Sequence, residues 1–147
     1  MVLFPNLKLY VGCALTHATK EFIDEVAQLK EDLREVCIVL DFLGLTDESA
    51  YGIYEHDIHN CVMQCHLMLA ITDQPSTGLG YEMATQSEKR KAPLLAVADM
   101  QSRVSDLILD TRQPGFRFER YENLRKDVTP WVIEELKKIN EALNNAA

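Results

Sequence analysis

Residues 67–82 read LMLAITDQPSTGLGYE, an apolar run followed by a turn with two glycines. The run from Leu67 to Ile71 predicts a buried parallel strand, and the glycines predict a turn that opens a helix near Leu79. In open α/β sheets, ligands bind beyond the carboxyl ends of the strands. Glycines there let the backbone approach a ligand, and the free N–H groups of a helix start favour anions. Glu82, expected in the first helical turn, would face that crevice; the alternative is a plain turn with a helix-stabilising glutamate.

Strand and helix patterns alternate along the rest of the chain. Strands are expected at residues 7–13, 36–40, 67–71, 93–98 and 116–121, the last as a half-exposed edge strand. Helices are expected around an apolar face of Phe22, Val26, Leu29 and Leu33, and at 48–64, 79–91, 105–109 and 129–143. The second helix follows a loop around Gly44 and carries one apolar stripe, made of Tyr54, Ile58, Cys61 and Cys65. This order predicts an α/β fold: a doubly wound, mainly parallel five-stranded sheet with helices on both faces, in a single domain over residues 1–147.

Composition excludes several classes of partner. The net charge of −8 argues against a nucleic-acid polymer, which needs a basic surface, although it leaves a single nucleotide possible. No apolar run is long enough to span a bilayer, and the N-terminal MVLFP lacks the basic segment of a signal peptide, so a cytoplasmic location without membrane contact is expected. The cysteines are expected to be reduced and mostly buried. Cys61, Cys65, His66 and His59 match no standard zinc spacing, so no metal is expected.

Common catalytic motifs are absent from the sequence. It has no Walker lysine motif, no G-x-G-x-x-G turn after the first strand and no G-x-S-x-G elbow. What remains is a pair of carboxylates, Asp57 and Glu82, on the helices either side of the third strand. Two carboxylates that flank a crevice suit glycosidic bond chemistry, because one acts at C1 and the other handles the leaving group's proton. The alternative for Asp57 is a solvated helix residue, and for His17, His56 and His59 a helix-cap or solvated role is expected rather than acid catalysis.

Two segments, YEHD at 54–57 and QPSTGLGYE at 74–82, resemble the nucleoside 2-deoxyribosyltransferase family. Within that family the chain is most similar to the 2′-deoxynucleoside 5′-phosphate N-hydrolases, and the resemblance extends from the first strand to about Asp110. It implies a flavodoxin-like, Rossmann-like fold that cleaves the N-glycosidic bond of deoxynucleosides or their monophosphates. It also implies that the enzyme needs no metal or organic cofactor and forms a homodimer or a higher homo-oligomer.

The resemblance assigns a role to each candidate site residue. Glu82 is the nucleophile at C1′, Asp57 handles the base and its proton, and Tyr10 lines the pocket. The expected substrate-binding residues are Tyr10, Gly12, Ser76, Gly78, Gly80 and Ser105, with Ser105 reaching the phosphate in a neighbouring subunit and Arg103 able to add charge.

Ser76 is the residue that distinguishes substrate types in this resemblance. Members acting on free nucleosides tend to carry Asp at this position, and that carboxylate would repel a phosphate. A serine hydroxyl donates a hydrogen bond to a phosphate instead. The expected reaction is therefore hydrolysis of nucleoside 5′-monophosphates. Transfer of the sugar between bases and non-catalytic nucleotide sensing are the alternatives.

The loop after the first strand departs from the pattern of the phosphate-using branch. It reads GCALTHAT at residues 12–19 and lacks that branch's arginine. Thr16, His17 and the start of the following helix are its expected substitutes. The segment from Asp57 to Ala70 is also one residue longer than in that branch.

Overall fold

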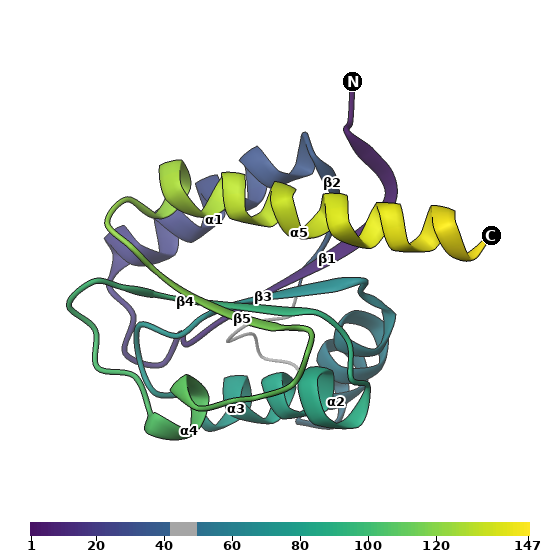
Figure 1. Ribbon diagram of the computed structural model, residues 1–147. Helices are drawn as coiled ribbons and strands as arrows, with labels where there is room; N and C mark the ends of the chain where they lie inside the picture. The colour runs from purple at the N-terminus through teal and green to yellow at the C-terminus, as the bar shows by residue number, and fades with distance from the viewer. Residues whose placement is uncertain (42–49) are drawn as a thin grey trace.

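The computed structural model describes residues 1–41 and 50–147. Within these ranges, parallel strands form one five-stranded sheet in the order β2-β1-β3-β4-β5 (Figure 1). The strands are β1 (Phe4–Cys13), β2 (Cys37–Leu40), β3 (Leu67–Ile71), β4 (Leu94–Asp99) and β5 (Phe116–Tyr121). The predicted doubly wound α/β fold is confirmed. In this strand order the winding direction reverses between β1 and β3, which is where ligands bind in such sheets.

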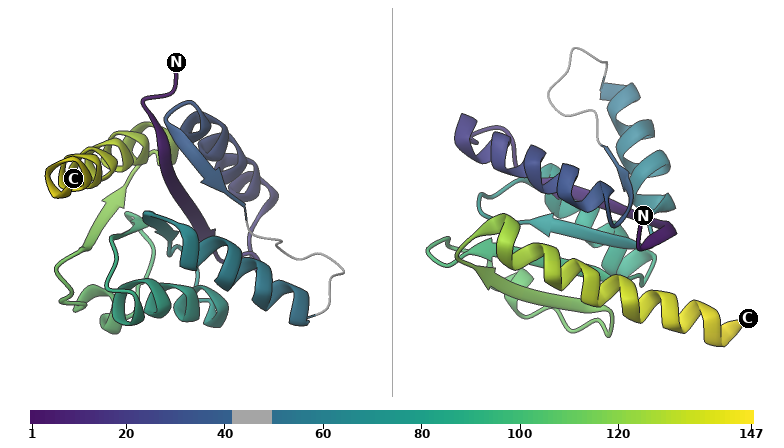
Figure 2. Two further views of the ribbon diagram at one scale, coloured as in Figure 1. Left: turned by 90° about the vertical axis from the view of Figure 1, so that its right-hand side faces the viewer. Right: turned by 90° about the horizontal axis from the view of Figure 1, so that it is seen from above.

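The helices cover both faces of the sheet (Figures 1 and 2). Two long helices, α1 (Lys20–Arg34) and α5 (Leu124–Ala146), lie side by side on one face. Three short helices lie on the other face: α2 (Ala50–Tyr54), α3 (Thr77–Ala84) and α4 (Asp106–Leu109). Wider, π-helical turns continue α2 through Glu55–Cys61 and α3 through Thr85–Lys89, and a 3-10 turn at Val62–Gln64 follows the first of these.

The strands separate two apolar layers. Leu9 and Val11 contribute to the layer under α1 and α5, whereas Tyr10 contributes to the layer under α2 and α3. This alternation follows from the two-residue repeat of a strand. Tyr10 is only 1% exposed, although it carries a hydroxyl that needs a partner on the α2 and α3 face.

The last helix starts earlier than the sequence predicts. It begins at Leu124 rather than near Thr129 because Asn123 caps it, its side chain accepting a hydrogen bond from the Lys126 backbone N–H at 2.9 Å. The Asp127 carboxylate accepts two more backbone N–H bonds at this end, from Glu122 and Asn123. Pro130 therefore lies inside the helix rather than at its first turn.

The second predicted helix differs in its winding. Its predicted start at Glu48 and the loop around Gly44 lie outside the described residues. Tyr54, expected on the inward stripe, is 48% exposed, while Ile58 and Cys61 are buried as expected. The stripe assumed 3.6 residues per turn, whereas the turns from Glu55 onward are π-helical and shift the phase of the buried face.

No helix of the described ranges is long and apolar enough to cross a membrane. Residues 1–41 and 50–147 also contain no group of three or more histidine, cysteine or acidic side chains placed to hold a metal ion. The four cysteines are free thiols; Cys37, Cys61 and Cys65 are buried and Cys13 is half-buried.

Candidate active site

Glu82 lies on α3 beside the end of β1. The helix begins at Thr77, two residues before the predicted start, so Glu82 is in its second turn rather than its first. Ser76 sets this start, because its Oγ accepts a hydrogen bond from the Leu79 backbone N–H at 3.2 Å. From β1, the Tyr10 hydroxyl donates a hydrogen bond to Glu82 Oε2 across 72 positions of sequence. That bond ties the carboxylate on α3 to β1, which pairs with β3 at the switch in winding direction.

A cavity of about 320 Å³ surrounds the Glu82 carboxylate. Its walls come from the end of β1 and the loop after it, from α2 and the turn that follows, and from α3. They comprise Tyr10, Cys13, Leu15, Thr16, Ile53, Tyr54, Asp57, Ile58, Ser76, Gly78, Leu79, Tyr81 and Glu82. Five residues that the resemblance selected thus share one cavity: Tyr10, Asp57, Ser76, Gly78 and Glu82.

Burial and neighbouring charge alter the acidity of this site. The pKa of Glu82 is raised to about 7: burial raises it most, the hydrogen bond from Tyr10 opposes the rise, and the negative charge of Asp57 adds to it. Burial and the charge of Glu82 also raise the pKa of Tyr10, so its hydroxyl keeps its proton and remains a donor. A carboxylate with a pKa this close to neutrality is the kind of group that catalytic sites use.

Three predicted substrate-binding residues lie outside the Glu82 cavity. Gly12 lies below it: a Cβ there would come within 3.0 Å of Leu79 Cδ1 and 3.3 Å of Met68 Cε, so the absence of a side chain lets α3 pack on β1. Gly80 and Ser105 line a second cavity instead, on the other side of α3. The Ser105 hydroxyl caps α4 by accepting a hydrogen bond from the Leu107 backbone N–H at 3.2 Å.

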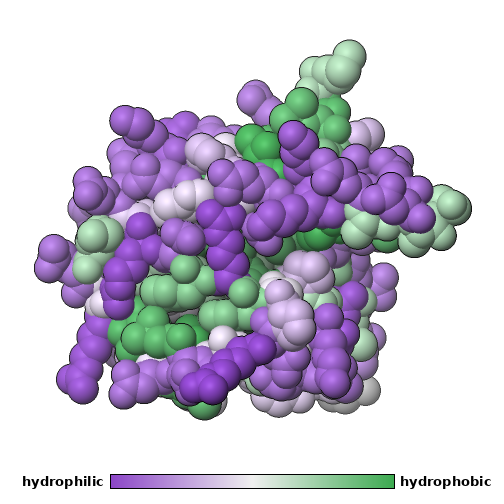
Figure 3. Space-filling view, viewed as in Figure 1, coloured by the Kyte–Doolittle hydropathy of each residue, from purple (hydrophilic) through white to green (hydrophobic). Residues whose placement is uncertain are grey.

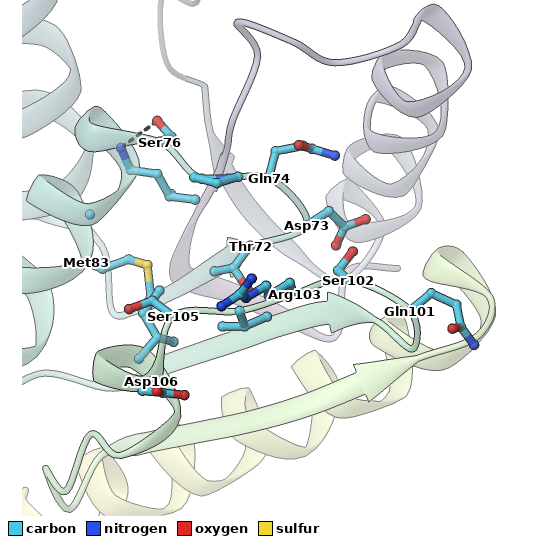
Figure 4. Close-up of a pocket in the computed structure, with 15 residues that line it drawn as sticks. Thr72, Asp73, Gln74, Ser76, Met83, Gln101, Ser102, Arg103, Ser105 and Asp106 are labelled. Atoms are coloured by element: carbon cyan, nitrogen blue, oxygen red, sulfur yellow. Dashed lines mark hydrogen bonds between the residues drawn. The ribbon is translucent and has the colours of Figure 1, made fainter.

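This second cavity has a volume of about 660 Å³ and lies at the carboxyl ends of β3 and β4 (Figure 4). Ser76 and Leu79 line both cavities, so the first turn of α3 separates them. The remaining lining residues are Thr72, Asp73, Gln74, Pro75, Gly80, Met83, Gln101, Ser102, Arg103, Val104, Ser105, Asp106 and Ile108.

Sequence reasoning missed Tyr54 and Tyr81 as site residues. Both rings line the Glu82 cavity, yet they are 48% and 57% exposed. Tyr81 directly precedes the nucleophile candidate, which was the available signal. The helical spacing predicts Tyr54 in the core, so it gave no signal for a site residue.

Two of the histidines weighed as acids, His56 and His59, contact other protein groups. Nε2 of His56 lies 2.6 Å from the carbonyl oxygen of Asp41, and the His59 ring meets the Tyr54 ring edge-on at 5.2 Å between centroids. His17 is exposed. Within the described part of the chain, none of these three histidines lines the Glu82 cavity.

Comparison with known proteins identifies the fold alone. No family model matches the sequence, and no curated protein matches it. Among solved structures, the chain is similar to the lysine decarboxylase LdcF of Francisella novicida, with 13% identity and a TM-score of 0.56. The match covers 93% of this chain but only 18% of the decarboxylase. At this identity the likeness supports a shared Rossmann-like α/β fold, and it adds no support for the deoxyribosyltransferase resemblance.

Proposed function

We propose that this protein hydrolyses the N-glycosidic bond of (2′-deoxy)nucleoside 5′-monophosphates, releasing the free base and (deoxy)ribose 5-phosphate. One observation carries the proposal. A mostly buried carboxylate, Glu82, is held by the Tyr10 hydroxyl in a cavity that Asp57 also lines. Two carboxylates at one cavity, one of them with a pKa of about 7, suit the attack on an anomeric carbon.

In the first step, the Glu82 carboxylate forms a bond to C1′ while the bond from C1′ to the base nitrogen breaks. The base takes the electron pair of that bond beside Asp57. In the second step, water attacks C1′ and the ester to Glu82 breaks, which restores the carboxylate. One proton of that water ends on the base, so the products balance as free base and sugar phosphate.

The cavity offers different chemistry to the two ends of such a substrate. At the start of α3, the Ser76 oxygen accepts the Leu79 N–H, which leaves its own hydrogen free to donate to a phosphate. Backbone N–H groups at the start of a helix also favour an anion such as a phosphate. The exposed rings of Tyr54 and Tyr81 lie on the same cavity and suit a planar base. The volume of about 320 Å³ is at the lower end of the range for small-molecule sites.

Product analysis of purine and pyrimidine (deoxy)nucleoside monophosphates tests the proposal. We expect Glu82→Gln to lower kcat by about a thousandfold or more, because the neutral amide is a poor nucleophile. The matched control is Glu88→Gln, an exposed glutamate on the turn that continues α3, which should keep wild-type activity. Wild-type turnover by Glu82→Gln would remove Glu82 from the mechanism.

The same assay separates the alternative functions. Sugar exchange onto an added free base would identify a deoxyribosyltransferase, since that reaction differs only in the acceptor. Nucleotide binding without cleavage after prolonged incubation would identify a sensor. The resemblance further implies a homodimer in which Ser105 reaches the phosphate of a second subunit.

A further inference from the structure

The larger cavity, beside Arg103, lies outside the Glu82 cavity in which the proposed reaction takes place. It is about twice the volume of the Glu82 cavity, 660 against 320 Å³, and shares Ser76 with it. We infer that it binds the distal half of an extended substrate, a nucleoside 5′-diphosphate whose second phosphoryl group carries a sugar. This inference rests on the proposed function, which directs the 5′ end of the nucleotide toward Ser76.

The wall of the larger cavity is fixed before any ligand binds. Arg120 donates hydrogen bonds to the carbonyl oxygens of Asp99 and Ser102, at 3.0 and 2.8 Å, and so holds the turn after β4. The Asp99 backbone N–H donates to Asp73 Oδ1 at 3.0 Å, and the Tyr121 hydroxyl donates to Asp73 Oδ2. These bonds tie the ends of β3, β4 and β5 together. A site held in this way loses little freedom on binding, which favours affinity.

The lining of this cavity matches a sugar phosphate. Arg103 is exposed and makes no hydrogen bond or ion pair with any other described residue, so its guanidinium is available. In Figure 4 its side chain lies in the middle of the labelled residues. A guanidinium pairs with a phosphoryl group through two parallel hydrogen bonds. The amides of Gln74 and Gln101 and the carboxylate of Asp106 supply acceptors and donors for sugar hydroxyls.

Because Ser76 lines both cavities, a ligand bound at its hydroxyl would reach both of them. A phosphoryl group at the Ser76 hydroxyl has the Glu82 carboxylate on one side of the first turn of α3 and the Arg103 cavity on the other. A monophosphate fills only the first side. A diphosphate that carries a sugar reaches both, and it places its second phosphoryl group toward Arg103.

Calorimetric titration of Glu82→Gln, which cannot complete the reaction, tests this inference with AMP, ADP and ADP-ribose as probes. We expect ADP-ribose to bind at least about tenfold more tightly than AMP, with ADP between them. Adding Arg103→Met should abolish that gain, weakening ADP-ribose binding far more than AMP binding. The matched control is Arg112→Met, an exposed arginine paired with Asp110, which should leave all three Kd values unchanged.

Equal affinity for the three probes would overturn the inference, and so would an equal loss of AMP and ADP-ribose binding in Arg103→Met. Cleavage of AMP by the wild-type protein is measured separately. Cleavage without any gain for ADP-ribose would overturn the inference and keep the proposed reaction. A gain that depends on Arg103, without cleavage of AMP or of any purine or pyrimidine deoxynucleoside monophosphate by the wild-type protein, would support the second cavity and overturn the proposed reaction.

Discussion

The Glu82 carboxylate sets the expected pH dependence of the proposed enzyme. Only the ionised form of Glu82 attacks C1′. In the protein without substrate, burial together with the charge of Asp57 raises the pKa of Glu82 to about 7. We therefore expect kcat/KM to rise as pH increases through about 7 and to level off above it. The profile is measured on a deoxynucleoside monophosphate between about pH 5 and pH 9.

Tyr10→Phe tests the origin of that midpoint. The Tyr10 hydrogen bond lowers the pKa of Glu82, so its removal should move the midpoint to higher pH. Tyr121→Phe is the control, because it removes a comparable part-buried hydrogen bond from a tyrosine to a carboxylate, at Asp73, and should leave the midpoint in place. A midpoint that stays unchanged in Tyr10→Phe would mean that Glu82 is not the titrating group.

At the scale of elements, Gly12 in β1 beneath α3 and the exposed Gly80 on α3 should respond in opposite ways to alanine. A Cβ at Gly80 meets nothing within 4 Å, so Gly80→Ala should stabilise the helix by about 0.5–1 kcal/mol. A Cβ at Gly12 comes within 3.0 Å of Leu79 Cδ1, so Gly12→Ala should destabilise the protein by about 1–3 kcal/mol. Urea unfolding measures both. Equal and small effects would contradict the close packing of Leu79 over β1.

At the scale of the whole molecule, an ion-pair network joins the edge of the sheet to α5. Arg117 on β5 donates to Glu134 and Glu135 at 2.9 and 3.0 Å, and Glu135 is only 9% exposed. Lys138 also reaches Glu135, at 2.9 Å, but its side chain is largely exposed. The buried carboxylate thus depends on Arg117 for a partner that is itself shielded from water.

Arg117→Met should therefore destabilise the protein by about 1–3 kcal/mol, since it leaves the Glu135 charge poorly paired. The control is Arg125→Met, which removes the more exposed pair with Asp32 between α5 and α1 and should cost less than about 1 kcal/mol. The free energies of unfolding in urea are compared at neutral pH. A larger loss in the control than in Arg117→Met would refute this account of the β5–α5 contact.

The surface of the whole molecule is mainly polar on the face seen in Figure 3, with apolar side chains gathered along the edge at β5 and above α4. Phe116 and Phe118 of β5 are half-buried there, as the predicted edge strand requires. The alternation of polar and apolar residues in FRFERY was enough to predict an edge strand, because such a strand is only partly covered by its neighbours and is therefore half-exposed.

Local patterns predicted most elements but not their ends. The apolar run at 67–71 and the glycine turn after it gave β3 and α3, because burial and backbone freedom act over a few residues. The predicted start of α5 near Thr129 was wrong because Asn123 and Asp127 cap the helix one turn earlier, at Leu124. Tyr54 was placed in the core because π-helical turns leave no clear mark in a sequence.

The sequence alone determined the alternation of strands and helices, and hence the class of sheet and the candidate residues near its carboxyl edge. Only the tertiary structure joined Tyr10 to Glu82 and set Ser76 between two cavities. It also placed three of the predicted substrate-binding residues outside the Glu82 cavity, namely Gly12, Gly80 and Ser105. The physical reason is range. Backbone preference and burial pattern act between near neighbours, whereas these contacts depend on strand order and on which side of α3 each residue occupies, and both are fixed only when the sheet assembles.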